Sequence, residues 1–274
     1  MKRLLSVLLL LATLPSLAAE VDTVSIFSNA MNRAYRCVVI KPESYKKGKA
    51  AYPTVYLLHG LGGRYSDWVT KAPELKAAAD RLNVLVVCPD GAVNSWYFDS
   101  PVDSSARFET YVGTEIPAYI DAHYRSIRAR SARAISGLSM GGHGALFIGY
   151  RHPATFGAVG SMSGAVQLEY ITAPMYGVEK RLGDTSNKAR YREYSIFGVL
   201  NDKRSDSLAL IVDCGTEDFI VEMSRALHKR LQELRIPHDY TERPGRHDWP
   251  YWNNAVQYQL LYFRNFFNRG KSSL

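Results

Sequence analysis

The sequence predicts an α/β fold in which a mostly parallel central sheet carries helices on both faces. The first observation is a series of short, nearly continuous apolar runs that stop at glycine or proline. Such runs are typical of strands that are buried on both faces, as in a parallel sheet. The second observation is that segments with helical spacing lie between these runs. Alternation of this kind places helices on both sides of the sheet, and residues 20–274 suit one such domain.

Seven segments are expected to form strands. Residues 54–60 and 84–91 are nearly continuous apolar runs that end in glycine. Residues 238–245 are more polar, as expected of a strand at the edge of the sheet. The full set comprises residues 35–42, 54–60, 84–91, 132–137, 158–164, 208–215 and 238–245.

Two amphipathic helices are expected between the strands. Residues 108–120 carry one apolar stripe, and residues 220–234 carry another. Pro117 lacks a backbone N–H, so it should kink the first helix or end its first part. Residues 166–207 differ from the rest, because they are long, polar and weakly periodic. An insertion of this kind is often a binding loop or a lid, and we expect it to line a pocket.

Composition is that of an ordinary globular protein, with a formal net charge of +8. The basic residues are scattered apart from residues 124–133, which we expect to be a solvated connection rather than a nucleic-acid surface. The three cysteines, Cys37, Cys88 and Cys214, are an odd number with no metal-ligand spacing. We therefore expect buried free thiols, and neither a metal nor another cofactor.

Residues 1–19 have the layout of a secretory signal peptide, with a basic start, an apolar run and small residues at the exit. The apolar run is too short to span a bilayer as a stable helix. Cleavage after Ala18 or Ala19 would release a secreted or periplasmic protein without stable membrane insertion. The alternative is a membrane anchor or a buried first helix.

Ser139 lies in a G-x-S-x-G pattern directly after an apolar run, in the stretch ISGLSMGGHGAL. A tight turn from strand to helix holds such a serine in a strained conformation and exposes its Oγ above the sheet. Glycine is needed two positions away on either side, because larger side chains would collide. We expect Ser139 to be a nucleophile; the alternative is a Gly-rich turn that happens to contain a serine.

A serine hydroxyl needs a base to remove its proton, and His247 is the candidate. It follows the last predicted strand and a Pro-Gly turn, whereas most other histidines lie within or beside predicted helices and strands. The alternative is a loop histidine that packs against Trp249 or Trp252.

The base in turn needs a carboxylate that fixes its tautomer and stabilises the imidazolium. The strand end DCGTEDF offers Asp213, Glu217 and Asp218. We favour Asp218, since Asp213 is still within the strand, and Glu217 is the second candidate. Asp218 could instead only cap the following helix. The chain order Ser139, Asp218, His247 is that of α/β-hydrolases.

Backbone N–H groups must stabilise the negative oxygen of the tetrahedral intermediate. The Gly-rich turn HGLGG follows the predicted strand at 54–60. The expected donors are the N–H groups of Leu61 and of Met140, the residue after the nucleophile. The alternative is an ordinary glycine turn. His59 is expected to brace this loop by hydrogen bonds rather than to take part in the chemistry.

Six stretches of the chain together resemble the esterase D-like putative esterase family, also called carbohydrate esterase family one. They occur in the order that the family has and extend over nearly all of the chain beyond the predicted signal peptide. The stretches are HGLGG (59–63), SWYFDS (95–100), ETYVGTEIPAYID (109–121), GLSMGGHGAL (137–146), CGTEDF (214–219) and GRHDW (245–249).

The resemblance implies an α/β-hydrolase fold. It maps the nucleophile, acid and base of the family onto Ser139, Asp218 and His247, and the oxyanion donors onto Leu61 and Met140. The family includes feruloyl esterases, acetylxylan esterases, S-formylglutathione hydrolases and mycobacterial mycolyltransferases. Its members differ most in the region of the insertion, so the resemblance leaves the substrate open.

The sequence thus predicts a secreted serine carboxylesterase that acts on an acylated carbohydrate or a small ester. Feruloyl or acetyl esters on plant xylan are the first candidates, because an exported enzyme meets extracellular substrates. Trp96, Tyr97, Trp249 and Trp252 are expected to wall the pocket, or alternatively to belong to the core.

Three other activities remain open. An S-formylglutathione hydrolase is less compatible with export, and acyl transfer would need a long apolar channel. A non-catalytic polysaccharide-binding protein would not need Ser139, Asp218 and His247 together.

Overall fold

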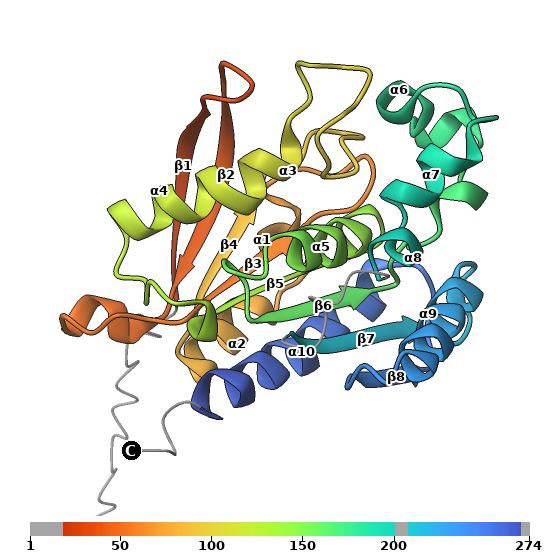
Figure 1. The fold of residues 1–274 in the computed structure, drawn as a ribbon. Coiled ribbons are helices and arrows are strands. Elements are labelled where there is room, and N and C mark those ends of the chain that lie inside the picture. The colour runs from red at the N-terminus through yellow and green to blue at the C-terminus, as the bar shows by residue number, and fades with distance from the viewer. Residues whose placement is uncertain (1–18, 201–207, 270–274) are drawn as a thin grey trace, which may run out of the picture.

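The structure, a computed structural model, describes residues 19–200 and 208–269. Most of the predicted signal peptide and the end of the 166–207 insertion therefore lie outside the described residues. Eight strands form one sheet in the order β1-β2-β4-β3-β5-β6-β7-β8 (Figure 1). Only β2 runs against its neighbours, and all pairs from β4 to β8 are parallel.

Each of the seven predicted strands is present, which confirms the α/β class. The polar last strand does lie at an edge of the sheet. A first strand that was not predicted lies at the other edge. The strands are β1 (Glu20–Ser28), β2 (Arg33–Lys41), β3 (Thr54–Leu58), β4 (Leu85–Pro89), β5 (Arg133–Gly137), β6 (Ala158–Met162), β7 (Ala209–Gly215) and β8 (Asp239–Arg243).

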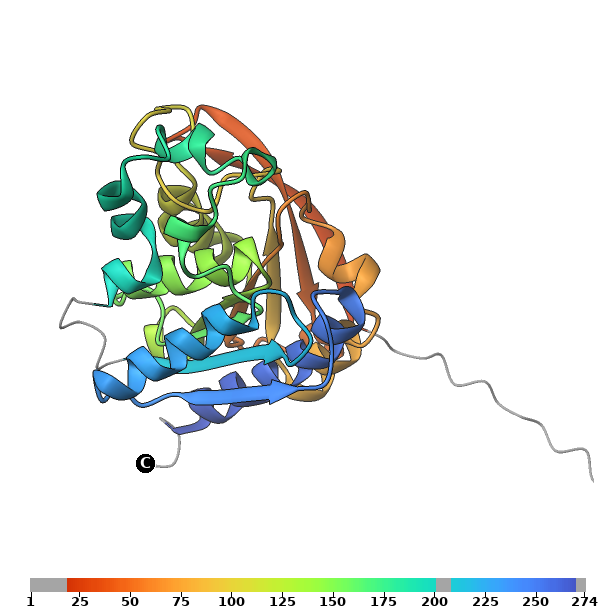
Figure 2. The ribbon, with the colours of Figure 1, turned by 90° about the vertical axis from the view of Figure 1, so that its right-hand side faces the viewer.

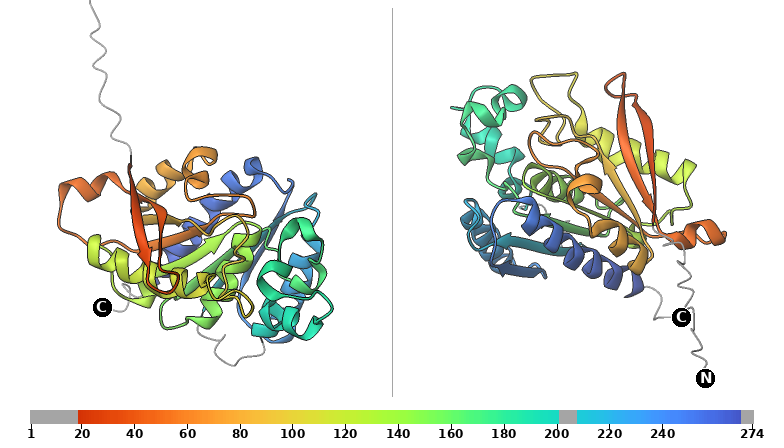
Figure 3. Two further views of the ribbon diagram at one scale, coloured as in Figure 1. Left: turned by 90° about the horizontal axis from the view of Figure 1, so that it is seen from above. Right: turned by 180° about the vertical axis from the view of Figure 1, so that it is seen from behind.

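Helices cover both faces of the sheet (Figures 2 and 3). On one face, α1 (Asp67–Lys71), α2 (Leu75–Leu82) and α10 (Trp249–Arg269) enclose one apolar cluster. On the other, α5 (Met140–Arg151) and α9 (Val221–Glu233) pack with the 108–123 segment around a larger cluster. Apolar side chains of the central strands alternate between the two clusters, which explains their continuous apolar runs.

The helix at 108–123 is interrupted rather than ended. It consists of α3 (Phe108–Thr110), a π-helical turn (Tyr111–Glu115) and α4 (Ile116–His123). The π-helical turn ends two residues before Pro117, whose missing N–H removes one bond from the helical ladder.

The insertion is folded into short helices over its described part. Two 3₁₀ turns precede three α-helices above the carboxyl ends of the strands (Figure 1). They are residues Leu168–Tyr170 and Pro174–Tyr176, then α6 (Glu179–Leu182), α7 (Lys188–Tyr194) and α8 (Ile196–Val199).

The connection at 124–133 corrects one expectation, since two of its arginines are anchored rather than solvated. Arg133 is buried and pairs with Asp121 at 2.6 Å. The Arg125 guanidinium donates to the carbonyl oxygens of Tyr45 and Gly48. The three cysteines are buried free thiols, as expected.

Candidate active site

Ser139 occupies the turn between β5 and α5 and has a strained backbone, with φ 53° and ψ −117°. A Cβ atom on Gly137 or Gly141 would collide with backbone atoms, so no larger residue fits two positions from the serine. The Ser139 N–H donates to the Met162 carbonyl at 3.0 Å, which ties the turn to the end of β6. The surroundings therefore hold the serine in a conformation that it would not adopt freely.

The structure brings Ser139, His247 and Asp218 together from three separate loops. His247 Nε2 lies 2.9 Å from Ser139 Oγ. On the other side of the ring, Nδ1 lies 2.9 and 3.0 Å from the two carboxylate oxygens of Asp218. With Nδ1–H donating to the carboxylate, Nε2 is free to accept the hydroxyl proton.

The Asp218 side chain is fully buried. Burial by itself raises the pKa of this carboxyl, but hydrogen bonds from His247, the Ile220 N–H and Ser163 outweigh it and lower the pKa. Asp218 therefore stays ionised beside the imidazole. The Ile220 N–H donates to Asp218 Oδ1 at 3.0 Å, so the same carboxylate also accepts a hydrogen bond from a backbone N–H at the start of α9.

The other two candidate carboxylates, those of Glu217 and Asp213, do not face His247. Glu217 is exposed and pairs with Arg246 at 3.1 Å. Asp213 is buried, pairs with Arg243 at 2.5 Å and accepts a hydrogen bond from Tyr251. Neither contacts His247 in the described part of the chain.

Two backbone N–H groups beside Ser139 are unused. Within residues 19–200 and 208–269, the N–H groups of Leu61 and Met140 have no protein acceptor. The Gly62 N–H donates to the Val93 carbonyl at 2.8 Å and the Gly63 N–H to the Gly60 carbonyl at 3.0 Å, so the turn itself is fixed. Free donors on a fixed turn are what an oxyanion requires.

His59 braces this turn from below. Its Nε2 accepts the Gly91 N–H at 2.8 Å, so Nδ1 carries the proton and donates to the Gly60 carbonyl at 2.8 Å. Burial lowers the pKa of His59, which keeps the ring neutral.

A cavity of about 500 Å³ opens beside Ser139. Its walls come from the Gly-rich turn, the insertion, the start of α9 and the start of α10. The large apolar and aromatic side chains that line it are Leu61, Trp96, Leu138, Tyr170, Ile171, Tyr176, Phe219, Ile220, Met223, Trp249 and Trp252. Most of this surface is apolar, so the cavity suits an apolar or aromatic group.

The expectation for Tyr97 was wrong. Trp96 lines the cavity, but Tyr97 is fully buried behind it and does not reach the cavity. The Tyr97 hydroxyl donates to the His59 carbonyl at 3.0 Å, and its ring packs against Gly144 of α5. Tyr97 therefore belongs to the core that supports the Gly-rich turn.

Two aromatic rings flank the imidazole: Phe219, which sequence reasoning missed, and Trp252, which it placed in the pocket wall. The Phe219 ring is 4.6 Å from the His247 ring, although Phe219 is 69% exposed. Trp252 lies edge-on to the imidazole at 4.9 Å and donates its indole N–H to Ser163 Oγ at 3.2 Å. The Ser163 hydroxyl also helps to lower the pKa of Asp218, so Ser163, which sequence reasoning missed too, acts on both sides of the ring.

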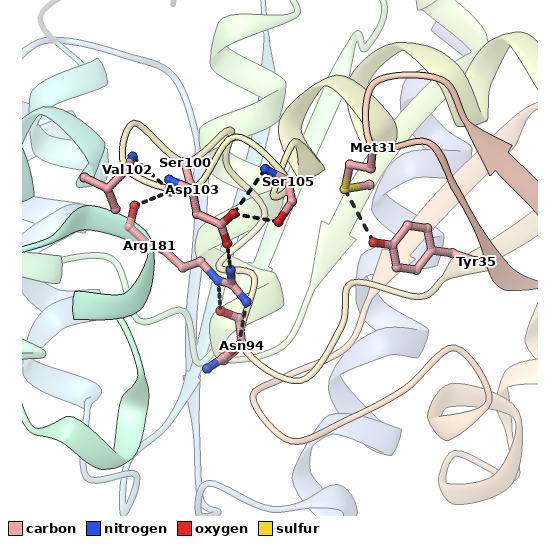
Figure 4. A network of polar contacts seen from close by, with 8 residues as sticks. All are labelled: Met31, Tyr35, Asn94, Ser100, Val102, Asp103, Ser105 and Arg181. Carbon is pink, nitrogen blue, oxygen red and sulfur yellow. Dashed lines mark hydrogen bonds and ion pairs between the residues drawn. The ribbon is translucent and has the colours of Figure 1, made fainter.

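The insertion is fixed to the loop that carries Trp96 (Figure 4). The Arg181 guanidinium lies 2.5 Å from Asp103 and bonds the backbone and side-chain oxygens of Asn94 at 3.2 and 3.1 Å. The Trp96 indole N–H donates to the Tyr176 carbonyl at 3.0 Å. These contacts place the insertion as a fixed wall of the cavity.

Two further properties concern residues 19–200 and 208–269. No helix in these ranges is long and apolar enough to cross a membrane. They contain no group of three histidine, cysteine, aspartate or glutamate side chains placed to hold a metal ion.

Comparisons with known proteins agree with the geometry. A family model described as "Putative esterase" matches residues 28–263. An acetyl esterase from Caldicellulosiruptor saccharolyticus is 33% identical over 222 residues, which are 74% of this chain and 80% of that esterase.

Two solved structures illustrate the similarity of fold. A ferulic acid esterase has a TM-score of 0.79 and 29% identity, over 91% of this chain and 98% of its own. An S-formylglutathione hydrolase from Agrobacterium tumefaciens has a TM-score of 0.79 over 92% of this chain and 97% of its own, at 22% identity, so its likeness concerns the fold alone. With the family model spanning most of its length, the chain belongs to the putative esterase family and has an α/β-hydrolase fold, as the sequence resemblance predicted.

Proposed function

We propose that the chain is a serine carboxylesterase in which Ser139 is the nucleophile, His247 the base and Asp218 the acid. The observation that carries the proposal is the continuous hydrogen-bonded path from Ser139 Oγ through the imidazole to the Asp218 carboxylate. An ordered path of this kind activates a hydroxyl that is otherwise a poor nucleophile.

The reaction has two halves. His247 Nε2 takes the Ser139 proton as Oγ bonds to the ester carbonyl carbon, and the N–H groups of Leu61 and Met140 bind the resulting oxyanion. The carbon–oxygen bond to the alcohol then breaks, and the alcohol leaves with the proton from His247. Water attacks the acyl-enzyme with His247 again as base, which releases the acid and restores Ser139.

The proposed substrates are feruloyl or acetyl esters on xylan. The cavity of about 500 Å³ is much larger than an acetyl group needs, and its aromatic lining favours the feruloyl group. The names of two relatives, an acetyl esterase and a ferulic acid esterase, support the same pair of acyl groups.

We also propose that the protein is secreted or periplasmic. The support is the sequence pattern of residues 1–19, of which residues 1–18 lie outside the described part of the chain. Strand β1 begins at Glu20, so cleavage after Ala18 or Ala19 would leave the sheet intact.

Hydrolysis of p-nitrophenyl acetate by the wild type and by Ser139→Ala tests the mechanism. We expect the variant to be at least about 10⁴-fold slower, since the oxyanion hole and binding alone leave only a small residual rate. Ser161→Ala, a buried serine on β6 whose Oγ has no partner in the described residues, is the matched control.

A panel of methyl ferulate, acetylated xylan and S-formylglutathione tests the substrate. We expect hydrolysis of one of the first two. Preference for the glutathione ester would contradict the xylan assignment. Equal inactivity of wild type and Ser139→Ala, together with xylan binding, would favour a non-catalytic binding protein.

A further inference from the structure

Two hollows continue from the catalytic cavity across the surface. The first, about 480 Å³, shares Gly62 and Gly63 with the catalytic cavity. The second, about 410 Å³, shares Asp90, Ala92 and Val93 with the first. Because each hollow shares lining residues with the next, the three lie in a row that begins at Ser139, and we refer to this row as the groove.

Four arginines line the two outer hollows: Arg36 and Arg64 in the first, Arg33 and Arg181 in the second. We call this part of the groove the basic groove. Asp90 is its only lining carboxylate among the described residues, and Asp90 Oδ1 already accepts the Ala92 N–H at 2.7 Å. The basic groove therefore carries an excess of positive charge.

The reversed direction of β2 explains how the arginines reach this place. Strand β2 begins at Arg33 and runs antiparallel to β4, so its first residues lie beside the carboxyl end of β4. The Asp90 N–H, just past that end, donates to the Arg36 carbonyl at 3.0 Å. The carboxyl ends of parallel strands are where the ligands of open α/β sheets bind, and Ser139 lies at the same edge.

Three of the four arginines have no carboxylate partner in residues 19–200 and 208–269. Arg33 lies over the Tyr35 ring, and Arg36 donates to the Tyr65 hydroxyl at 2.9 Å, but neither forms an ion pair. Arg64 is exposed, and no interaction of its side chain is recorded within those ranges. Only Arg181 is neutralised, by Asp103, as Figure 4 shows. Unpaired guanidinium groups can form bidentate hydrogen bonds with carboxylates.

We propose that the basic groove binds the carboxylates of an acidic carbohydrate chain, namely a uronate-bearing oligosaccharide that presents its ester to Ser139. This inference rests on the proposed function, because it assigns the alcohol side of the same ester. A polymeric alcohol must continue beyond the acyl cavity, and the groove offers it a path past Gly62 and Gly63. Tyr35 and Tyr65 line the same two hollows beside the arginines, and their hydroxyl groups can bond sugar hydroxyls.

Binding to the full-length Ser139→Ala protein tests the proposal without requiring catalysis. The probes are xylo-oligosaccharides that bear glucuronate side groups, and the same oligosaccharides after reduction of the carboxyl groups to alcohols. By calorimetry at low salt we expect the acidic form to bind about tenfold more tightly, since each partly exposed charge pair adds a modest free energy. In 0.5 M NaCl the difference should largely disappear.

The variant Arg33→Gln/Arg36→Gln/Arg64→Gln, in the same background, should bind both forms equally. The matched control Lys49→Gln/Arg81→Gln/Arg235→Gln removes three exposed cations that line neither the cavity nor the groove, and should keep the preference. Melting temperatures verify that both variants are folded.

Several results would overturn the assignment. Equal affinity of the Ser139→Ala protein for acidic and reduced oligosaccharides is one, and an unchanged preference in the groove variant is another. Equally tight binding of a short polyphosphate would show that the arginines attract any polyanion. The binding measurements do not depend on turnover. A wild type that hydrolyses no ester would therefore contradict the proposed function without deciding whether the groove binds an acidic oligosaccharide.

Discussion

At the scale of residues, two serines with positive φ hold the site together. Ser139 has φ 53° and Ser163 has φ 47°, a region that residues other than glycine rarely occupy. The Ala165 N–H donates to the Ser139 carbonyl at 3.2 Å, so the loop after β6 is bonded to the turn that carries Ser139. Ser163 lies in that loop, where its N–H donates to the Asp213 carbonyl at 2.8 Å and its Oγ accepts the Trp252 indole N–H. The strain at both positions is therefore supported by bonds around them.

Ser163→Ala should lower kcat for p-nitrophenyl acetate about tenfold, the equivalent of one lost hydrogen bond at a buried site. The substitution leaves the Trp252 indole N–H without its acceptor and removes a hydroxyl that lowers the pKa of Asp218. Because the pKa of Asp218 should then rise, the acidic limb of the pH–rate profile should also move to higher pH.

Ser161→Ala is the control. It removes a buried hydroxyl from the same segment, and this hydroxyl has no hydrogen-bond partner in the described residues. A merely structural role for Ser163 would lower the melting temperature without moving the pH–rate profile, and that result would refute the positioning role.

The side chains that we propose to react were readable from the sequence, whereas their surroundings were not. A serine esterase needs a serine on a turn between glycines, a histidine after the last strand and a carboxylate at a strand end. Ser139, His247 and Asp218 could therefore be named from the sequence. Phe219 and Ser163 carry no such pattern, because their roles depend on which loops meet. Tyr97 was instead assigned to the cavity by mistake, because the sequence does not show that Tyr97 packs in the core while its neighbour Trp96 lines the cavity.

At the scale of elements, the contacts of Arg181 join helix α6 to the loop at 94–105. Ser100 Oγ donates to the Arg181 carbonyl at 2.6 Å, so backbone and side chain of the same residue are both held. The Asp103 carboxylate also accepts bonds from Ser105, whose hydroxyl donates at 2.6 Å. Together with the Trp96–Tyr176 bond, these contacts set the distance between two walls of the cavity, and the Arg181 guanidinium supplies the charged part of them.

Arg181→Gln should raise KM for methyl ferulate about tenfold while changing p-nitrophenyl acetate hydrolysis much less. The reason is that an aromatic acyl group needs both walls of the cavity, Trp96 on one side and the insertion on the other. The substitution removes the charged hydrogen bonds to Asp103 and Asn94 that hold these walls together. Steady-state kinetics on both esters measures the difference.

Lys180→Gln is the matched control, because it removes one exposed positive charge from the same helix. Equal losses on both esters in Arg181→Gln would mean that the contacts stabilise the fold without setting the size of the cavity.

The elements missing from the sequence prediction were missed for different reasons. Strand β1 lies at a sheet edge and exposes most of its residues, so it lacks the apolar run that marks the central strands. Helix α10 does carry a readable stripe, since its buried residues recur at intervals of three and four. The insertion was harder, because short helices of four to seven residues have too few turns to show a period.

At the scale of the whole molecule, a histidine is enclosed in the larger of the two apolar clusters. His143 of α5 is completely buried, stacks on Phe147 at 5.7 Å and lies edge-on to Trp96 and Phe98. Its Nε2 donates to the Tyr194 carbonyl at 2.8 Å, which links α5 to the insertion. Protonation of this ring would place an unpaired charge in the core, so acid should act on the stability of the entire domain.

Burial lowers the pKa of His143 to about 4, although the Tyr194 carbonyl partly opposes the shift. Between the ordinary histidine pKa and this value the unfolded chain binds a proton that the folded protein does not, so the free energy of unfolding falls as the pH drops. The shift corresponds to a loss of about 3 kcal/mol in the free energy of unfolding between pH 7 and pH 4.

His143→Gln keeps a donor for the Tyr194 carbonyl but cannot titrate, so urea unfolding should show a smaller loss of stability between pH 7 and pH 4. The exposed His123→Gln should follow the wild type, and parallel curves for wild type and His143→Gln would mean that other groups set the acid sensitivity.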